Sequence, residues 1–153
     1  MYGLRPRTIR GGIDVRILAL DVGERRIGLA ISDPLGTIAQ PLMTIANNDT
    51  SLESIARIVH EKEIGEIVVG LPVNMNGTPG PRVREVQEFA RRMKEQIDIA
   101  VVFIDERLTT VEAEKLMISA DVRRQKRRQT IDSIAAAIIL EKRLRERPGG
   151  ALI

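Results

Sequence analysis

Three carboxylates occupy positions from which they could share a metal ion. Asp21 closes the apolar run Arg16–Leu20, Glu106 follows the apolar run Ile99–Ile104, and Asp132 opens the last apolar-periodic segment. Because carboxylates held together repel one another unless a cation neutralises them, a meeting of these three would favour a divalent ion. Their hard oxygen ligands suit Mg²⁺ or Mn²⁺. Two such ions about 3.5–4 Å apart can clamp the attacking and leaving oxygens of an in-line phosphoryl displacement.

Each of these acids also has a structural interpretation. Asp21 could accept hydrogen bonds in the turn that follows it, and Asp132 could be a helix N-terminal acid that interacts with the dipole. Glu106 could pair with Arg107 or Arg26 on the surface. The metal hypothesis therefore depends on the three acids meeting in space, which their spacing in the sequence does not establish.

Two further acids compete for the same role. Asp105 is adjacent to Glu106, and in a strand the two side chains point to opposite faces. Asp33 precedes Pro34 and is typical of a turn residue. We therefore expect Glu106, and neither of these two neighbours, to complete the trio.

The elements that must position these acids follow from the apolar pattern. Strands are predicted at Arg16–Leu20, Ile27–Ser32, Ile67–Leu71 and Ile99–Ile104, and within Thr37–Ile45. Helices are predicted after the capping-box pairs Thr50/Glu53 and Thr109/Glu112, after Pro81, and after Thr130. This order predicts an α/β fold with a mixed five-stranded sheet, whose first three strands are antiparallel, and with helices on both faces. Ligands bind beyond the carboxyl ends of such parallel strands. The small residues Ala135 and Ala136 would let the last helix approach that edge closely.

The length of 153 residues suits one domain. We assign residues 13–147 to this domain, residues 1–12 to a basic N-terminal tail, and residues 148–153 to a frayed C-terminus. The absence of cysteine excludes disulfides and thiolate zinc sites. The absence of cysteine also suits the reducing cytoplasm, where we expect the protein. Because no apolar run reaches the roughly 18 residues of a membrane span, we expect no membrane partner.

Positive charge is concentrated in two segments, although the net charge is only +3. The first segment is the tail, and the second is a predicted loop, Ala120–Thr130, which contains Arg123, Arg124, Lys126, Arg127 and Arg128. Clustered basic residues beside an acidic body favour a nucleic-acid partner, although a solvated loop is an equal alternative. The few aromatic residues, with Phe89 and Phe103 interpreted as core, favour phosphate contacts over base stacking.

Several residues near the acids are candidates for binding a substrate phosphate. Asn74 and Thr78 belong to a loop rich in Asn and Gly, whose backbone N–H groups could meet a phosphate or could simply connect a strand to a helix. Arg26 and Arg107 flank the acids and could contact a phosphate or form ion pairs with those acids.

Four segments carry a resemblance to a known family. They are LALDVGERRIGLAISD (Leu18–Asp33), VVGLPVNMNGTPG (Val68–Gly80), FIDERLTTVEAE (Phe103–Glu114) and DSIAAAIIL (Asp132–Leu140). In this order they resemble the YqgF, or RuvX-like, family. The resemblance implies a ribonuclease-H-like fold and implies that Asp21, Glu106 and Asp132 are its catalytic, metal-binding acids, with Mg²⁺ or Mn²⁺ as cofactor. The longer N-terminal extension departs from the family.

The resemblance implies a nuclease that matures the 5′ end of pre-16S ribosomal RNA, with structured RNA as the favoured substrate. A Holliday junction resolvase acting on branched DNA is the close alternative, and it would need a dimer for two symmetric cuts. We expect a monomer or a weak homodimer. A non-catalytic nucleic-acid-binding module is the third possibility. An actin-like ATPase is disfavoured because such enzymes clasp the nucleotide between two domains.

Overall fold

A computed structural model describes residues 15–74, 76–105 and 124–146 of the chain, with only the backbone described for residues 124–130. Its strands are β1 (Arg16–Val22), β2 (Arg26–Ser32), β3 (Ala39–Ala46), β4 (Ile64–Leu71) and β5 (Ala100–Asp105). Its described helices are α1 (Ser51–Glu61), α2 (Val83–Gln96) and α4 (Arg124–Glu146). None of these helices is both long and apolar enough to cross a membrane. The helix predicted after Thr109 lies outside the described residues.

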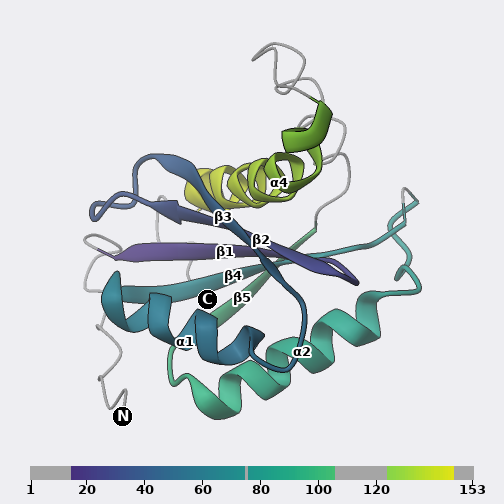
Figure 1. The fold of residues 1–153 in the computed structure, drawn as a ribbon, viewed down its shortest axis with the longest axis horizontal. Helices are drawn as coiled ribbons and strands as arrows, with labels where there is room; N and C mark the ends of the chain where they lie inside the picture. Colours follow the sequence, from purple (N-terminus) through teal and green to yellow (C-terminus); the bar gives the residue numbers. More distant parts are fainter. Residues whose placement is uncertain (1–14, 75, 106–123, 147–153) are drawn as a thin grey trace.

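The strands form one sheet in the order β3-β2-β1-β4-β5 (Figure 1). The pairs β1–β2 and β2–β3 are antiparallel, whereas β1–β4 and β4–β5 are parallel. The predicted mixed sheet is therefore confirmed. Leu20 pairs with Val69, and Leu71 pairs with Asp105, so the carboxyl ends of β1, β4 and β5 lie along one edge.

The two faces of the sheet are covered by different helices, as Figure 1 shows. Because side chains alternate along a strand, β1 sends Leu18 and Leu20 into the core that contains α1 and α2. It sends Ile17 and Ala19 to the opposite face, where they pack with Leu140 and other residues of α4. Full burial of one such aliphatic side chain contributes roughly 1.5–3 kcal/mol. Helices on both faces are confirmed.

The last helix begins earlier than the sequence pattern predicts. A loop was expected up to Thr130, but α4 is helical from Arg124. The segment Arg124–Thr130 contains no Gly or Pro, and its Arg, Lys and Gln residues are good helix formers. Asp132 therefore lies about two turns inside the helix, and its interpretation as a helix N-terminal acid is wrong.

The capping box predicted at Thr50 and Glu53 is also absent. Thr50 is the N-cap residue of α1, but its side chain makes no capping hydrogen bond. Its hydroxyl donates instead to Asn48 Oδ1 at 2.7 Å. The Ser51 hydroxyl accepts a hydrogen bond from Asn48 N and donates to Ala46 O. Both the backbone N and the hydroxyl of Thr50 thus donate to Asn48 Oδ1 in a polar turn that takes the place of the capping box.

The two phenylalanines differ in burial. Phe89 on α2 is 4% exposed, which confirms its assignment to the core. Phe103 is 39% exposed, so its assignment to the core is wrong. Phe103 lies on β5, which is an edge strand of the sheet. The apolar sequence of a strand does not reveal whether one side of it is left exposed.

The opposite edge of the sheet is β3. Its register against β2 shifts by one residue, because Leu29 pairs with Met43 and Ala30 pairs with Pro41. Leu42 is therefore the extra residue of a β-bulge beside a proline.

Candidate active site

Gly28 brings two of the three predicted acids together. Asp21 on β1 pairs directly with Gly28 on β2. A Cβ atom added at Gly28 would lie 1.9 Å from the Asp132 carbonyl oxygen, so the backbone of α4 touches β2 at this point. Asp21 alternates in phase with Ile17 and Ala19, which pack against α4. Asp21 therefore faces α4, and Asp132 lies on the part of α4 that touches the residue paired with Asp21.

Arg26 supplies positive charge to this pair of acids. It is the first residue of β2, and its Nε donates to Asp132 Oδ2 at 2.7 Å. The Arg26 side chain is 41% exposed and that of Asp132 is 24% exposed. Of the two roles considered for Arg26, the ion pair with a site acid is present. Its contact with a substrate phosphate remains a prediction.

The third predicted acid, Glu106, lies outside the described residues, as does Arg107. Within the part of the chain that is described, no group of three or more His, Cys, Asp or Glu side chains is placed to hold a metal ion. β5 nevertheless shows which face of the sheet each side chain takes, up to Asp105, the residue before Glu106. Ile104 packs on the α4 face, whereas Val101 packs on the opposite face, which Asp105 shares by alternation.

Asp33 is a structural acid, as its position before Pro34 predicts. Its carboxylate accepts hydrogen bonds from Thr37 N at 2.6 Å, Thr37 Oγ1 at 2.7 Å and Ile38 N at 2.7 Å. Desolvation alone would raise the pKa of this carboxyl, but the hydrogen bonds from Ile38 and Thr37 outweigh it and lower the pKa to about 2. Asp33 therefore closes the β2–β3 turn and is not a member of the site.

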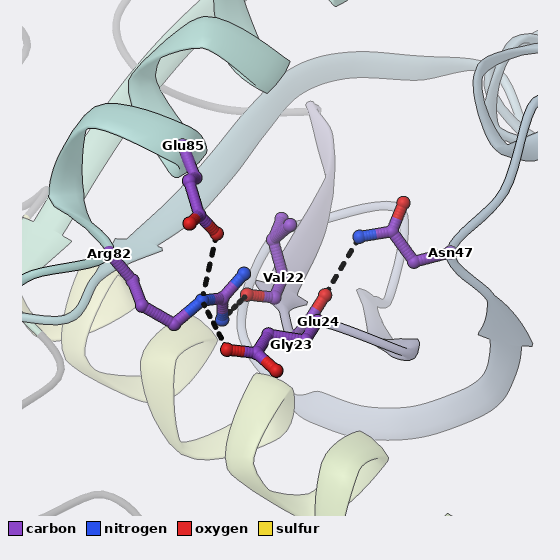
Figure 2. A network of polar contacts seen from close by, with 6 residues as sticks. All are labelled: Val22, Gly23, Glu24, Asn47, Arg82 and Glu85. Atoms are coloured by element: carbon purple, nitrogen blue, oxygen red, sulfur yellow. Dashed lines mark hydrogen bonds and ion pairs between the residues drawn. The ribbon is translucent and has the colours of Figure 1, made fainter.

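Arg82 clamps the end of the strand that carries Asp21 (Figure 2). Its Nη1 donates to Val22 O at 3.0 Å, and its Nε donates to Glu85 Oε2 at 3.1 Å. Glu24 Oε1 lies 3.9 Å from the same Nε. Because Arg82 is the N-cap residue of α2, it ties the start of that helix to the main chain beside Asp21. This contact spans 60 residues, and no local sequence signal indicates it.

Asn47 holds the same turn from the side of β3. Its Nδ2 donates to Gly23 O at 2.7 Å (Figure 2), and its backbone N donates to Arg25 O at 2.9 Å. A polar pocket of about 300 Å³ opens between this turn and α2. The turn that joins Asp21 to Arg26 is thus fixed from two neighbouring elements.

We expect Arg82→Met to lower the free energy of unfolding by about 0.5–1.5 kcal/mol, because a partly buried hydrogen bond to Val22 O is lost. Hydrogen exchange of the Gly23 amide, which donates to Arg26 O, should quicken as the turn loosens. Urea unfolding and exchange measured by NMR check both effects. Arg84→Met removes an exposed arginine of the same helix and serves as the control. Equal effects from the two variants would contradict the clamp.

The loop after β4 satisfies much of its own hydrogen bonding. Asn74 N donates to Thr78 O at 2.8 Å, and Asn74 Nδ2 donates to Thr78 Oγ1 at 2.9 Å. Gly77 has a φ of 88°, which favours glycine. The loop lies at the edge of the sheet that carries Asp21, since it follows the carboxyl end of β4. Contact of Asn74 and Thr78 with a phosphate remains a prediction.

Only part of the predicted basic segment belongs to the described residues. Arg123 lies outside them. The backbone at Arg124, Lys126, Arg127 and Arg128 is helical, so these residues occupy the first turns of α4, ahead of Asp132. These basic residues thus belong to the same helix as Asp132. In the predicted loop, their position relative to Asp132 would not have been fixed.

Comparisons with known proteins agree on one group of relatives. The model of the RuvX family, described as Holliday junction resolvase, matches residues 15–146. A protein of Thermoanaerobacter pseudethanolicus named "Putative pre-16S rRNA nuclease" is 50% identical over 133 residues, which cover 85% of this chain and 96% of that protein. A protein of Bacillus thuringiensis with the same name is 49% identical over 131 residues, which cover 83% and 96%.

Among solved structures, Thermus thermophilus RuvC is similar in fold. The RuvC structure in complex with a Holliday junction substrate matches with a TM-score of 0.58 at 12% identity, covering 89% of this chain and 98% of that chain. A second RuvC structure matches with a TM-score of 0.51 at 11% identity, covering 85% and 96%. The expected ribonuclease-H-like fold is therefore confirmed.

Proposed function

The chain belongs to the RuvX family, and from that premise we propose that it is a divalent-metal-dependent nuclease that processes the 5′ end of pre-16S ribosomal RNA in the cytoplasm. Relatives that are half identical over nearly their whole length bear the name of that activity. The observation that supports the proposal is that Gly28 pairs with Asp21 and touches the backbone of Asp132, whose carboxylate binds Arg26.

The donor chemistry of this site fits a hard divalent cation. Asp21 and Asp132 offer carboxylate oxygens, which suit Mg²⁺ or Mn²⁺. Arg26 already compensates one of these carboxylates, as expected where acids gather. In the proposal the two acids hold two ions together with Glu106. When bound, such ions activate the attacking water and stabilise the leaving oxygen of a phosphodiester.

The role proposed for Glu106 is supported by the phase of β5. Ile104 faces α4, and an extended chain returns to the same face every second residue. Asp105 takes the opposite face by alternation, which leaves Glu106 as the proposed third acid. The carboxyl ends of β1 and β5, on either side of β4, lie along this same edge of the sheet.

Phosphate binding is assigned to the basic residues around this edge. The first turns of α4 carry the basic segment, and its Arg and Lys residues would bind the backbone of a nucleic acid. Arg26, Arg107, Asn74 and Thr78 would lie closer to the acids. Of the two phenylalanines, Phe89 is buried and Phe103 is exposed on β5, so base stacking could come from Phe103 alone and binding would mainly follow the shape and the phosphates of structured RNA.

Holliday junction resolution is the second candidate function, because the description of the family model names it. The same acids would serve either substrate. A resolvase needs two sites related by symmetry, so it must act as a dimer. The alternative of a non-catalytic module that only binds nucleic acid predicts binding without cleavage.

Cleavage assays with matched substrates test the proposal. We expect cleavage of a precursor RNA that carries the 5′ leader of 16S RNA when Mg²⁺ or Mn²⁺ is present, and none when EDTA removes the ion. A four-way DNA junction of similar length is assayed in parallel, and light scattering gives the mass in solution. Cleavage of the junction alone by a dimer would replace the RNA assignment, and binding without cleavage of either substrate would refute the nuclease.

A further inference from the structure

Arg26 contacts Asp132 through a single hydrogen bond at the surface. The bond runs from Nε to Oδ2 at 2.7 Å, and the two side chains are 41% and 24% exposed. A second ion pair of α4 is built differently, because Arg143 donates two hydrogen bonds to Glu66 and these side chains are 5% and 0% exposed. A one-point pair that water reaches is weakly held. Arg26 is therefore able to change partner without exposing a buried charge.

The position of Arg26 would favour such a change once a cation binds. Asp132 lies against Gly28, which pairs with Asp21. A divalent cation bound by these two acids would lie close to the Arg26 guanidinium. Two cations that share one carboxylate repel each other, and the repulsion is strongest where water is partly excluded. The Asp132 carboxylate therefore binds Arg26 more weakly when it also binds a metal ion.

We propose that Arg26 is the resident counter-charge of this carboxylate pair and that it moves to a phosphate of the nucleic acid when a divalent cation binds. This inference rests on the proposed function. A planar guanidinium matches phosphate geometry, so the released side chain gains a suitable partner at the surface. Metal and nucleic acid then strengthen each other's binding, and by linkage the factor is the same in both directions.

The first test measures metal binding in the absence of nucleic acid. Mn²⁺ is titrated into the full chain and free Mn²⁺ is followed by electron paramagnetic resonance. Arg26→Gln removes the competing charge, so we expect Mn²⁺ to bind about tenfold more tightly than in the wild type, a typical size for coupling between sites. Arg57→Gln removes the same charge from an exposed pair with Glu53 on α1 and should leave the affinity unchanged. Arg26→Lys keeps the charge and should stay close to the wild type.

The second test measures RNA binding with and without the ion. A fluorescent RNA hairpin is titrated in EDTA and in Ca²⁺, and a gel confirms that the RNA stays intact. We expect Ca²⁺ to tighten RNA binding about tenfold in the wild type and to have little effect in Arg26→Gln. The salt slope of binding in Ca²⁺ should fall by about 0.9 in that variant, because one phosphate contact is lost.

The outcomes separate this inference from the proposed function. If neither the wild type nor the variants bind Mn²⁺, the metal site itself is absent and the proposed function fails. If the wild type binds Mn²⁺ but Arg26→Gln binds it equally or more weakly, Arg26 only positions Asp132 and the inference is overturned. Weaker Mn²⁺ binding by Arg26→Lys than by the wild type would also overturn it.

Discussion

Replacing Gly28 by alanine is expected to destabilise the protein by about 1–3 kcal/mol and to lower its nuclease activity by about a hundredfold. The added Cβ would lie 1.9 Å from Asp132 O and 2.8 Å from Ser133 N. These are backbone atoms of a long helix, which cannot rotate away, so α4 must move off the sheet. Asp132 then moves relative to Asp21, and a misplacement of roughly 1 Å is enough to cost this much activity.

Gly65→Ala is the matched control for this experiment. A Cβ there would lie 2.8 Å from Val15 Cγ1, so the substitution also crowds a tightly packed site of the sheet. Gly65 is in the first part of β4, at the opposite end of the strands from Asp21. We expect a loss of stability in urea unfolding but a wild-type kcat for the folded protein. A wild-type kcat in Gly28→Ala would mean that the close approach of α4 does not position the acids.

Removing Arg143 alone should be among the most destabilising single changes in the described part of the chain. Glu66 on β4 is fully buried, and both of its carboxylate oxygens accept hydrogen bonds from Arg143, at 2.8 and 3.0 Å. In Arg143→Met the carboxylate loses this partner inside the protein. We expect the free energy of unfolding to fall by about 3–5 kcal/mol, measured by urea unfolding.

The double variant Glu66→Leu with Arg143→Met tests the reason for that loss. The double variant leaves no ionised group buried at this position. Most of the stability should therefore return, because apolar side chains of similar size often replace a buried ion pair without cost. Arg145→Met, which breaks an exposed pair with Glu141 on the same helix, should leave the urea midpoint unchanged. A double variant as unstable as Arg143→Met would show that packing, and not the unpaired charge, causes the loss.

The strands, and the sheet edge that carries Asp21, were predictable because strands buried on both faces form short apolar runs. In β1, Leu18 and Leu20 face one core and Ile17 and Ala19 the other, so the run is apolar throughout and ends at a carboxylate. The close approach of the last helix was also predicted, from its alanines, and Ala136 is indeed fully buried against the sheet. The sequence pattern did not indicate that Gly28 on the strand also provides room for the helix backbone.

An ion pair between Arg26 and one of the acids was among the alternatives that the sequence offered, but the choice of Asp132 as its partner and the buried pair Glu66–Arg143 were not predictable. Arg26 and Asp132 are 106 residues apart, and Glu66 and Arg143 are 77 residues apart. Nothing local selects one arginine from the many in the chain, because the partner is chosen by how α4 docks on the sheet. The start of α4 was missed for a related reason. A run of charges resembles a solvated loop, although Arg, Lys and Gln favour helix equally well.

The bulge beside Pro41 bears on how the molecule meets its neighbours. β3 borders the sheet, and its sequence AQPLMTIA contains no Lys, Arg, Asp or Glu to repel an incoming chain. Proline offers no N–H to a new partner, and the bulge twists the backbone out of the flat geometry that strand addition needs. The shape of the β3 backbone therefore hinders the addition of a strand from another chain. Because this protection does not depend on charge, it does not vary with salt or pH.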